Sequence, residues 1–165
     1  MPAKVLGKSE KQRFRQGLWF VVALVAALST LAWLGQRRAT AIDRVNWLSD
    51  YDQAAALAAD SDRLLLIDFT EPHCQACRMM DLNVFSRQTV ADSIEAGYVP
   101  IRVNLSDDSS QSLVMAQRYR IWAVPTLIIT DRHGRQIDRI EGGISEKQMI
   151  DWLRSVRLTK DRPTT

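Results

Sequence analysis

The sequence predicts an α/β fold with a mixed central sheet, preceded by a single transmembrane helix. Three observations lead to this prediction. Residues 17–35 form an uncharged apolar stretch, residues 64–69 form a short apolar run that ends at a turn, and residues 126–140 hold two strand-like segments around a tight turn. Strands separated by helical patterns favour a parallel sheet, whereas a tight turn between two strands predicts an antiparallel pair.

The net charge of +3 comes from the start of the chain and not from a basic face of the domain. Residues 1–16 hold five basic side chains and one acidic one, which leaves 17 of the 22 basic and 18 of the 19 acidic side chains to the rest. A nucleic-acid-binding domain usually carries a clustered excess of lysine and arginine. The sequence therefore predicts no nucleic-acid partner.

Residues 17–35 are predicted to be a transmembrane signal anchor. At about 1.5 Å per residue, a helix of this length crosses the roughly 30 Å hydrocarbon core of a bilayer. Trp19 and Trp33 lie near its ends, where indole rings favour the membrane interface. A cleaved signal peptide is the alternative, because residues 39–41 read Ala-Thr-Ala. The length of the apolar run and the arginines at 37–38 favour the anchor.

The charges on either side of this helix predict its orientation. Residues 1–16 form a basic tail with five basic side chains, whereas Arg37, Arg38 and Arg44 follow the helix. The larger positive charge normally stays in the cytoplasm. In a bacterial cell, the chain is then a single-pass protein of the inner (cytoplasmic) membrane, with its C-terminal domain facing the periplasm or the cell exterior.

Behind the anchor we expect a tether at residues 36–46, a domain at 47–158 and a disordered tail at 159–165. The domain begins with a weak first strand and a helix over residues 52–59, for which Ser49-Asp50 offers an N-cap.

The next segment carries the most informative strand of the domain. Residues 64–69 are apolar at every position but one, which is typical of a central strand covered on both faces. Pro72 breaks this strand, and a helix is predicted to begin at Cys74 and to carry Met79, Met80 and Phe85.

The second half of the domain alternates helices and strands and then forms a hairpin. We expect helices over residues 89–96 and from Ser109 or Ser110 to Tyr119, and strands over 98–105, 126–130 and 136–140, the last two joined by a turn at 131–134. A capping box of Ser145 and Gln148 begins the final helix. Its apolar stripe consists of Met149, Ile150, Leu153 and Val156.

The segment Cys74-Gln75-Ala76-Cys77 follows the buried strand and opens a helix. A helix N-terminus stabilises a thiolate, because it offers unpaired N–H groups and a positive partial charge. Cys74 is therefore predicted to attack a disulfide, and Cys77, one turn further on, to resolve the mixed disulfide. An inert disulfide, or two small buried residues, is the structural alternative.

Metal binding is a second possibility for these cysteines. With His73 and His133 they could complete a zinc ligand set, but the spacing of His133 fits no usual zinc pattern. A copper-handling or assembly protein is the alternative function, because two thiolates and His73 could hold a soft Cu(I) ion. No methionine-rich tract supports it. Thiol–disulfide exchange itself requires no metal or organic cofactor.

Residues 64–153 resemble the thioredoxin superfamily. The matching features are Asp68-Phe69 just before the cysteines, the C-x-x-C motif, Val124-Pro125-Thr126 before a strand, and Gly142-Gly143. Within that superfamily, the stretch IDFTEPHCQACRMMDLNVFS is similar to the C-terminal periplasmic domain of the disulfide reductase DsbD. The resemblance implies a thioredoxin-like fold and a thiol–disulfide oxidoreductase.

Two residues gain roles from this resemblance. Asp68 lies in an apolar strand, so its pKa is expected to be raised by burial. The resemblance implies that it accepts the proton of Cys77, whereas the alternative is a carboxylate that only bonds nearby backbone. Pro125 resembles the cis-proline of the family, although the sequence by itself favours the commoner trans bond.

Three more residues are candidates for the substrate surface. His73 stands where the family usually has an aromatic residue, and it either stabilises the thiolate or is a polar turn residue. Val124 precedes Pro125, where the backbone is free to pair with an extended substrate. Trp122 lines the same surface or packs in the core, and we favour the core. Gln75-Ala76 replaces the usual Gly-Pro, so the resemblance does not set the redox potential.

Together these features predict a membrane-anchored enzyme that exchanges dithiols and disulfides with protein thiols outside the cytoplasm. The similarity to DsbD favours a reductant, which an upstream thiol electron donor must recharge. A pure interaction module that uses the fold without turnover is a third hypothesis, against which the complete C-x-x-C motif argues.

Overall fold

A four-stranded sheet forms the centre of the computed structural model, which describes residues 43–107 and 109–160. In the order β2-β1-β3-β4, the strands are β2 (Tyr98–Asn104), β1 (Leu64–Thr70), β3 (Thr126–Thr130) and β4 (Gln136–Glu141). β1 and β2 are parallel, whereas β3 is antiparallel to both β1 and β4. The predicted α/β class, with a parallel part and a hairpin edge, is confirmed.

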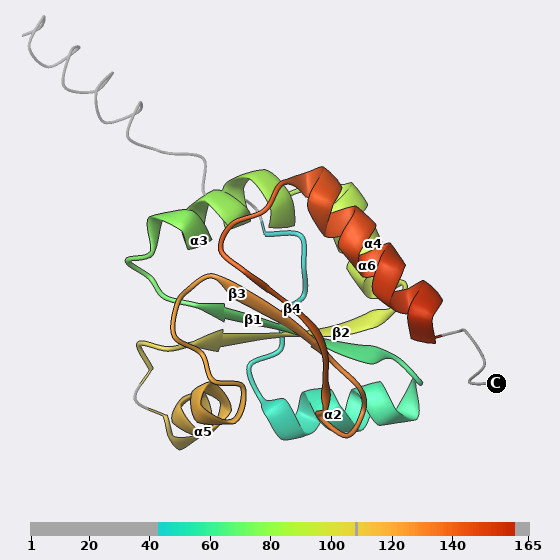
Figure 1. The fold of residues 1–165 in the computed structure, drawn as a ribbon, viewed down its shortest axis with the longest axis horizontal. Coiled ribbons are helices and arrows are strands. Elements are labelled where there is room, and N and C mark those ends of the chain that lie inside the picture. The colour runs from blue at the N-terminus through green and yellow to red at the C-terminus, as the bar shows by residue number, and fades with distance from the viewer. Residues whose placement is uncertain (1–42, 108, 161–165) are drawn as a thin grey trace, which may run out of the picture. The chain divides into compact units, whose positions relative to one another are not determined.

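Helices cover both faces of this sheet (Figure 1). One face is covered by α2 (Tyr51–Asp60) and α5 (Ser110–Arg118), and the other by α3 (Gln75–Met80), α4 (Gln88–Glu95) and α6 (Glu146–Lys160).

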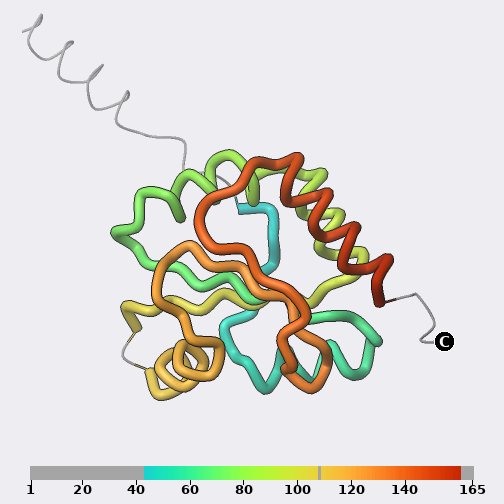
Figure 2. The backbone as a smooth tube through the Cα atoms, viewed as in Figure 1, coloured from blue at the N-terminus to red at the C-terminus, as the bar shows by residue number. Residues whose placement is uncertain are grey.

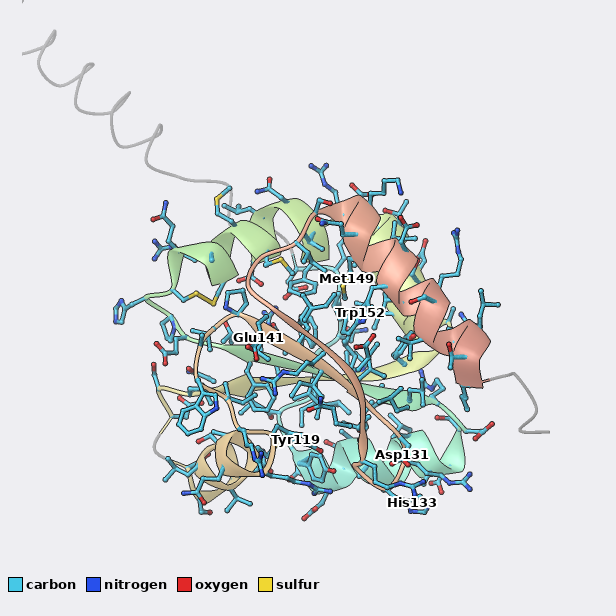
Figure 3. The ribbon with its side chains drawn as sticks, in the orientation of Figure 1. Tyr119, Asp131, His133, Glu141, Met149 and Trp152 are labelled. Atoms are coloured by element: carbon cyan, nitrogen blue, oxygen red, sulfur yellow. A yellow bond between two sulfur atoms is a disulfide. The ribbon has the colours of Figure 1, made fainter. Side chains whose placement is uncertain are left out.

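The apolar run of β1 follows from its position, because helices cover the sheet on both faces and side chains on both sides of the strand are buried. Leu64 and Leu66 pack in the core beneath α4 and α6, where Met149 and Trp152 of α6 also lie (Figure 3). Leu65, Ile67 and Phe69 pack in the core beneath α2 and α5. Full burial of each such side chain contributes about 1.5–3 kcal/mol.

Side-chain caps fix the starts of the helices close to their predicted positions. The backbone N–H of Gln53 donates to Asp50 Oδ1 at 2.8 Å, which places the N-cap of α2 at Asp50. The predicted capping box of α6 is present, since the N–H of Ser145 donates to Gln148 Oε1 at 2.9 Å and the N–H of Gln148 donates to Ser145 Oγ at 3.4 Å. The helix α6 continues to Lys160, two residues beyond the expected end of the domain at 158.

The sequence pattern predicted one regular helix from Cys74 to beyond Met80, but in the structure this helix changes its geometry after Met80. After α3 the chain forms a π-helical turn, η1 (Asp81–Phe85). A π turn holds one residue more than an α turn, so neighbouring side chains change their direction. Val84 and Phe85 are both buried as a result, while Asp81 is only half-buried.

The segment before α2 packs on the domain, although its first residues were expected to belong to the tether. Val45 is buried, and the N–H of Arg44 donates to the carbonyl of Phe85 at 3.1 Å. Leu48 forms a parallel bridge with Ile101 of β2, where a weak first strand was expected. Figure 2 shows this segment passing from the face covered by α3, α4 and α6 to the face covered by α2.

The predicted tail at 1–16, the anchor at 17–35 and most of the tether lie outside the described residues, as do residues 161–165. Within residues 43–107 and 109–160, none of the helices combines the length and the apolar character that a membrane span requires.

Candidate active site

Cys74 and Cys77 are joined by a disulfide at the start of α3, which is visible as the yellow bond in Figure 3. Cys74 is the N-cap residue of α3, and its Sγ accepts the backbone N–H of Cys77 at 3.0 Å. The central strand β1 ends four residues earlier, so the turn at 71–73 presents the disulfide beyond the carboxyl end of this strand. The predicted strand–turn–helix setting of the pair is confirmed.

The two sulfur-bearing residues differ in their access to solvent. Cys74 is half-buried, whereas Cys77 is only 4% exposed and belongs to the buried face of α3. A molecule that approaches from solvent therefore reaches the sulfur of Cys74 first. The bonded N–H of Cys77 and the dipole of the helical segment α3–η1 both favour negative charge on that sulfur after reduction.

The loop before β3, which contains Val124 and Pro125, also approaches the disulfide. The carbonyl oxygen of Val124 lies 3.6 Å from Cys74 Sγ, and the Val124–Pro125 peptide bond is cis, as the resemblance implied. The N–H of Gly142 donates to the carbonyl of Pro125 at 2.8 Å, which joins the loop after β4 to the same place. Gly142 has a φ of +86°, a conformation that favours glycine. Residues 74, 124 and 125 are thus brought together.

Asp68 lies on β1 and is 2% exposed. Burial raises the pKa of Asp68 to about 6, and Arg102 opposes this rise. The upward direction expected from the sequence is confirmed. Asp68 bonds a side chain and not only backbone, because Arg102 Nε donates to Asp68 Oδ2 at 2.8 Å.

Arg102 binds three carboxylates at once. Besides Asp68, its Nη1 donates to Asp43 Oδ2 at 2.9 Å and its Nη2 donates to Asp81 Oδ1 at 2.8 Å. The guanidinium carbon lies 4.5 Å from the ring centre of Trp47. Burial also raises the pKa of Asp81. We call Arg102, Asp43, Asp68 and Asp81 the arginine cluster.

Sequence reasoning did not identify the arginine cluster. A signal was present, because the mostly apolar strand at 98–105 carries one basic residue and the strand at 64–69 carries one acid. In the parallel register of β1 and β2, Asp68 stands opposite Arg102. No comparable pattern points to Asp43, which was expected to lie in the tether, or to Asp81, which reaches Arg102 from the π-helical turn.

The remaining candidates lie on the rim of the site. His73 is exposed and directly precedes Cys74, and Val124 is half-buried. Trp122 is 88% exposed, so its favoured placement in the core is wrong. It lies in the loop between α5 and β3, after Arg120, whose φ of +51° turns the chain outwards. The indole is therefore available to a substrate.

The described residues give no support to a metal site. Among residues 43–107 and 109–160, histidine, cysteine, aspartate and glutamate side chains form no group of three or more that could hold an ion.

Residues 51–157 match the family model of the thioredoxin-like domain. The thiol:disulfide interchange protein DsbD of Actinobacillus pleuropneumoniae is 24% identical over 115 residues, which cover 68% of this chain and 19% of that protein. The chain thus spans less than a fifth of the length of this curated relative.

Solved structures share the fold. A thioredoxin from Thermus thermophilus superposes with a TM-score of 0.63 at 26% identity, covering 72% of this chain and 91% of that one. The oxidised C-terminal domain of DsbD from Neisseria meningitidis superposes with a TM-score of 0.58 at 14% identity, covering 67% of this chain and 99% of that one. At 14% identity this second likeness concerns the fold alone.

Proposed function

Since this chain belongs to the family of thioredoxin-like domains, we propose that it is a membrane-anchored enzyme that exchanges dithiols and disulfides with protein thiols outside the cytoplasm. The family and the Cys74–Cys77 pair make it a thiol–disulfide oxidoreductase. The proposal extends this activity to a location, a substrate class and a role for each cysteine.

One observation carries the assignment of roles to the two cysteines. Cys74 is the more accessible residue and caps the helix, whereas Cys77 is buried one turn further in. In the reduced enzyme, the thiolate of Cys74 attacks a substrate disulfide, forms a mixed disulfide and releases one substrate thiol. Cys77 then loses its proton and attacks Cys74 Sγ, which releases the second substrate thiol and leaves the Cys74–Cys77 disulfide. Two electrons pass from the enzyme to the substrate.

Trapping of mixed disulfides tests this assignment. Cys77→Ser is expected to accumulate mixed disulfides with partner proteins, because the resolving thiol is missing. Cys74→Ser is expected to accumulate none, because the attacking thiol is missing. Both variants are analysed by non-reducing gel electrophoresis after acid quenching, with the double serine variant as the control. Equal trapping by the two single variants would contradict the assignment.

The direction of exchange is proposed from the similarity to the thiol:disulfide interchange protein DsbD. We assign this chain the role of a reductant. Each turnover oxidises the Cys74–Cys77 pair, so a further thiol protein must return two electrons to it. Trp122 and the backbone at Val124 are proposed to contact the substrate segment next to its cysteine, and His73 borders the same surface.

The location is proposed from the basic tail and the uncharged stretch at 17–35. In bacterial spheroplasts, a membrane-impermeant maleimide is expected to label reduced Cys74 of the full chain without lysis, because the domain faces outward. A cytoplasmic protein with an exposed cysteine, expressed in the same cells, reports any leakage. Labelling only after lysis would rule out this orientation, and recovery of a shortened soluble form would favour a cleaved signal peptide.

A further inference from the structure

Asp43 is held firmly at the end of the segment that was expected to be a tether. Its Oδ2 accepts hydrogen bonds from Arg102 Nη1 at 2.9 Å and from Trp47 Nε1 at 2.8 Å. Its Oδ1 accepts the backbone N–H of Val45 at 3.0 Å. The side chain of Asp43 is only 25% exposed. It is the first residue that the structure describes, and it is already part of the redox domain.

The ion pair between Asp43 and Arg102 affects the electrostatic stabilisation of the Asp68 carboxylate. Arg102 carries one positive charge and donates to three carboxylates, so the fully ionised arginine cluster has a net charge of −2. Each carboxylate weakens the stabilisation that the guanidinium gives to the other two. Asp68 is affected most, because at 2% exposure it has little water to stabilise its charge.

We propose that Asp43 is a positioning residue of the redox site, which raises the proton affinity of Asp68 by competing with it for Arg102. The expected effect of Asp43 on turnover rests on the proposed role of Asp68 as the proton acceptor for Cys77. The charged groups that face Asp68 are Arg102 on β2, Asp81 on η1 and Asp43 on the N-terminal segment. On the other side its partner in β3 is the apolar Leu127. Asp43 therefore links the segment that leads to the predicted anchor with the chemistry at Cys77.

The variant Asp43→Asn tests the inference in the full chain, purified in detergent micelles. Asparagine keeps the shape and one oxygen, which can accept the indole N–H of Trp47, but its NH2 group cannot accept the N–H of Val45. The substitution also removes one negative charge beside Arg102. The pKa of Asp68 is expected to fall, because one of the negative charges that raise it is removed. Carboxyl ¹³C NMR of the oxidised chain measures it, with the Asp68 signal assigned from its loss in Asp68→Asn.

A matched control separates this effect from the loss of an indole contact. Asp138 Oδ2 accepts the N–H of Trp152 at 2.9 Å, as Asp43 does from Trp47, but it does not bond Arg102 (Figure 3 labels Trp152). Asp138→Asn is expected to leave the titration of Asp68 unchanged. Asp43→Glu, which restores the charge, is expected to return the pKa of Asp68 towards the wild-type value.

Two readouts distinguish failure of this inference from failure of the proposed function. An Asp68 titration that is the same in Asp43→Asn and in the wild type overturns the inference, as does an equal shift in Asp138→Asn. The resolving step is followed separately as a function of pH, and its acid limb is expected to move to lower pH by the same amount as the titration. A shifted titration with an unshifted rate supports the link from Asp43 to Asp68 and refutes Asp68 as the proton acceptor.

Discussion

Replacement of Asp68 by asparagine is expected to slow the release of the mixed disulfide by about 10²–10⁴-fold, the usual contribution of a general base. Asparagine keeps the shape of the side chain but cannot accept the proton that Cys77 must lose. The first attack by Cys74 is expected to change far less, because the thiolate of Cys74 is stabilised by the start of α3. Stopped-flow reduction of a disulfide peptide, measured across neutral pH, separates the two steps.

The control for this variant is Asp81→Asn, which removes another carboxylate from the same guanidinium. It tests whether the loss of charge near Arg102 is enough to explain the effect, and it is expected to change the resolving rate by less than tenfold. Equal slowing by both variants, or an unchanged resolving step in Asp68→Asn, would reduce Asp68 to a structural residue.

Stability is expected to change in the opposite direction to the rate. The pKa of Asp68 is about 6 in the folded chain and about 3.9 in an unfolded one. The folded state therefore binds more protons between these values, so the stability contributed by Asp68 is complete below pH 4 and is lost as the pH rises through 6. Asp68→Asn lacks this loss and is expected to be more stable than the wild type above pH 6, by on the order of 2–3 kcal/mol. A variant that is slower but more stable cannot be explained by poor folding.

Replacement of Arg102 by methionine is expected to destabilise the domain by about 3–5 kcal/mol at pH 7, which is typical when one partner of a buried ion pair is removed. Methionine still fills the space beside Trp47, but it leaves the carboxylate of Asp68 buried without its cation. The penalty is expected to shrink towards pH 5, because Asp68 is then protonated and needs no counter-ion. Urea unfolding at several pH values measures both effects.

Arg139→Met is the matched control for this variant. The side chain of Arg139 is 27% exposed, close to the 24% of Arg102, but its carboxylate partner Glu141 is 60% exposed and can be hydrated. Its loss is expected to reduce stability by less than about 1 kcal/mol, as for most exposed ion pairs. If both arginine variants lose the same stability at every pH, the arginine cluster has no special role in the fold.

The sequence predicts the sheet and the redox pair well because their causes are local. The apolar run at 64–69, the turn at 131–134 and the capping box at 145–148 each depend on residues close together in the chain. The cysteine pair is equally local, since its setting is one strand, one turn and one helix start.

The parts that the sequence did not predict depend on contacts between distant segments. Arg102 meets Asp68 only through the register of two strands, and it meets Asp43 across 59 positions of the chain. The π-helical turn η1 contacts the core through Val84 and Phe85 and bonds Arg102 through Asp81, and helix propensity does not signal it. Trp122 was expected in the core because large aromatic residues usually are buried, but the loop before Pro125 turns it into solvent.

On the outer edge of β2, the backbone groups next to Leu48 are not free to pair with another strand. Pro100 has no N–H to offer, the carbonyl of Tyr98 accepts a bond from Arg63 Nη1 at 3.3 Å, and Leu48 bonds both the carbonyl of Pro100 and the N–H of Arg102. An open strand edge is a template on which another extended chain can add by backbone pairing. Because Leu48 occupies this stretch of β2, its backbone groups there are not open to pairing with another extended chain.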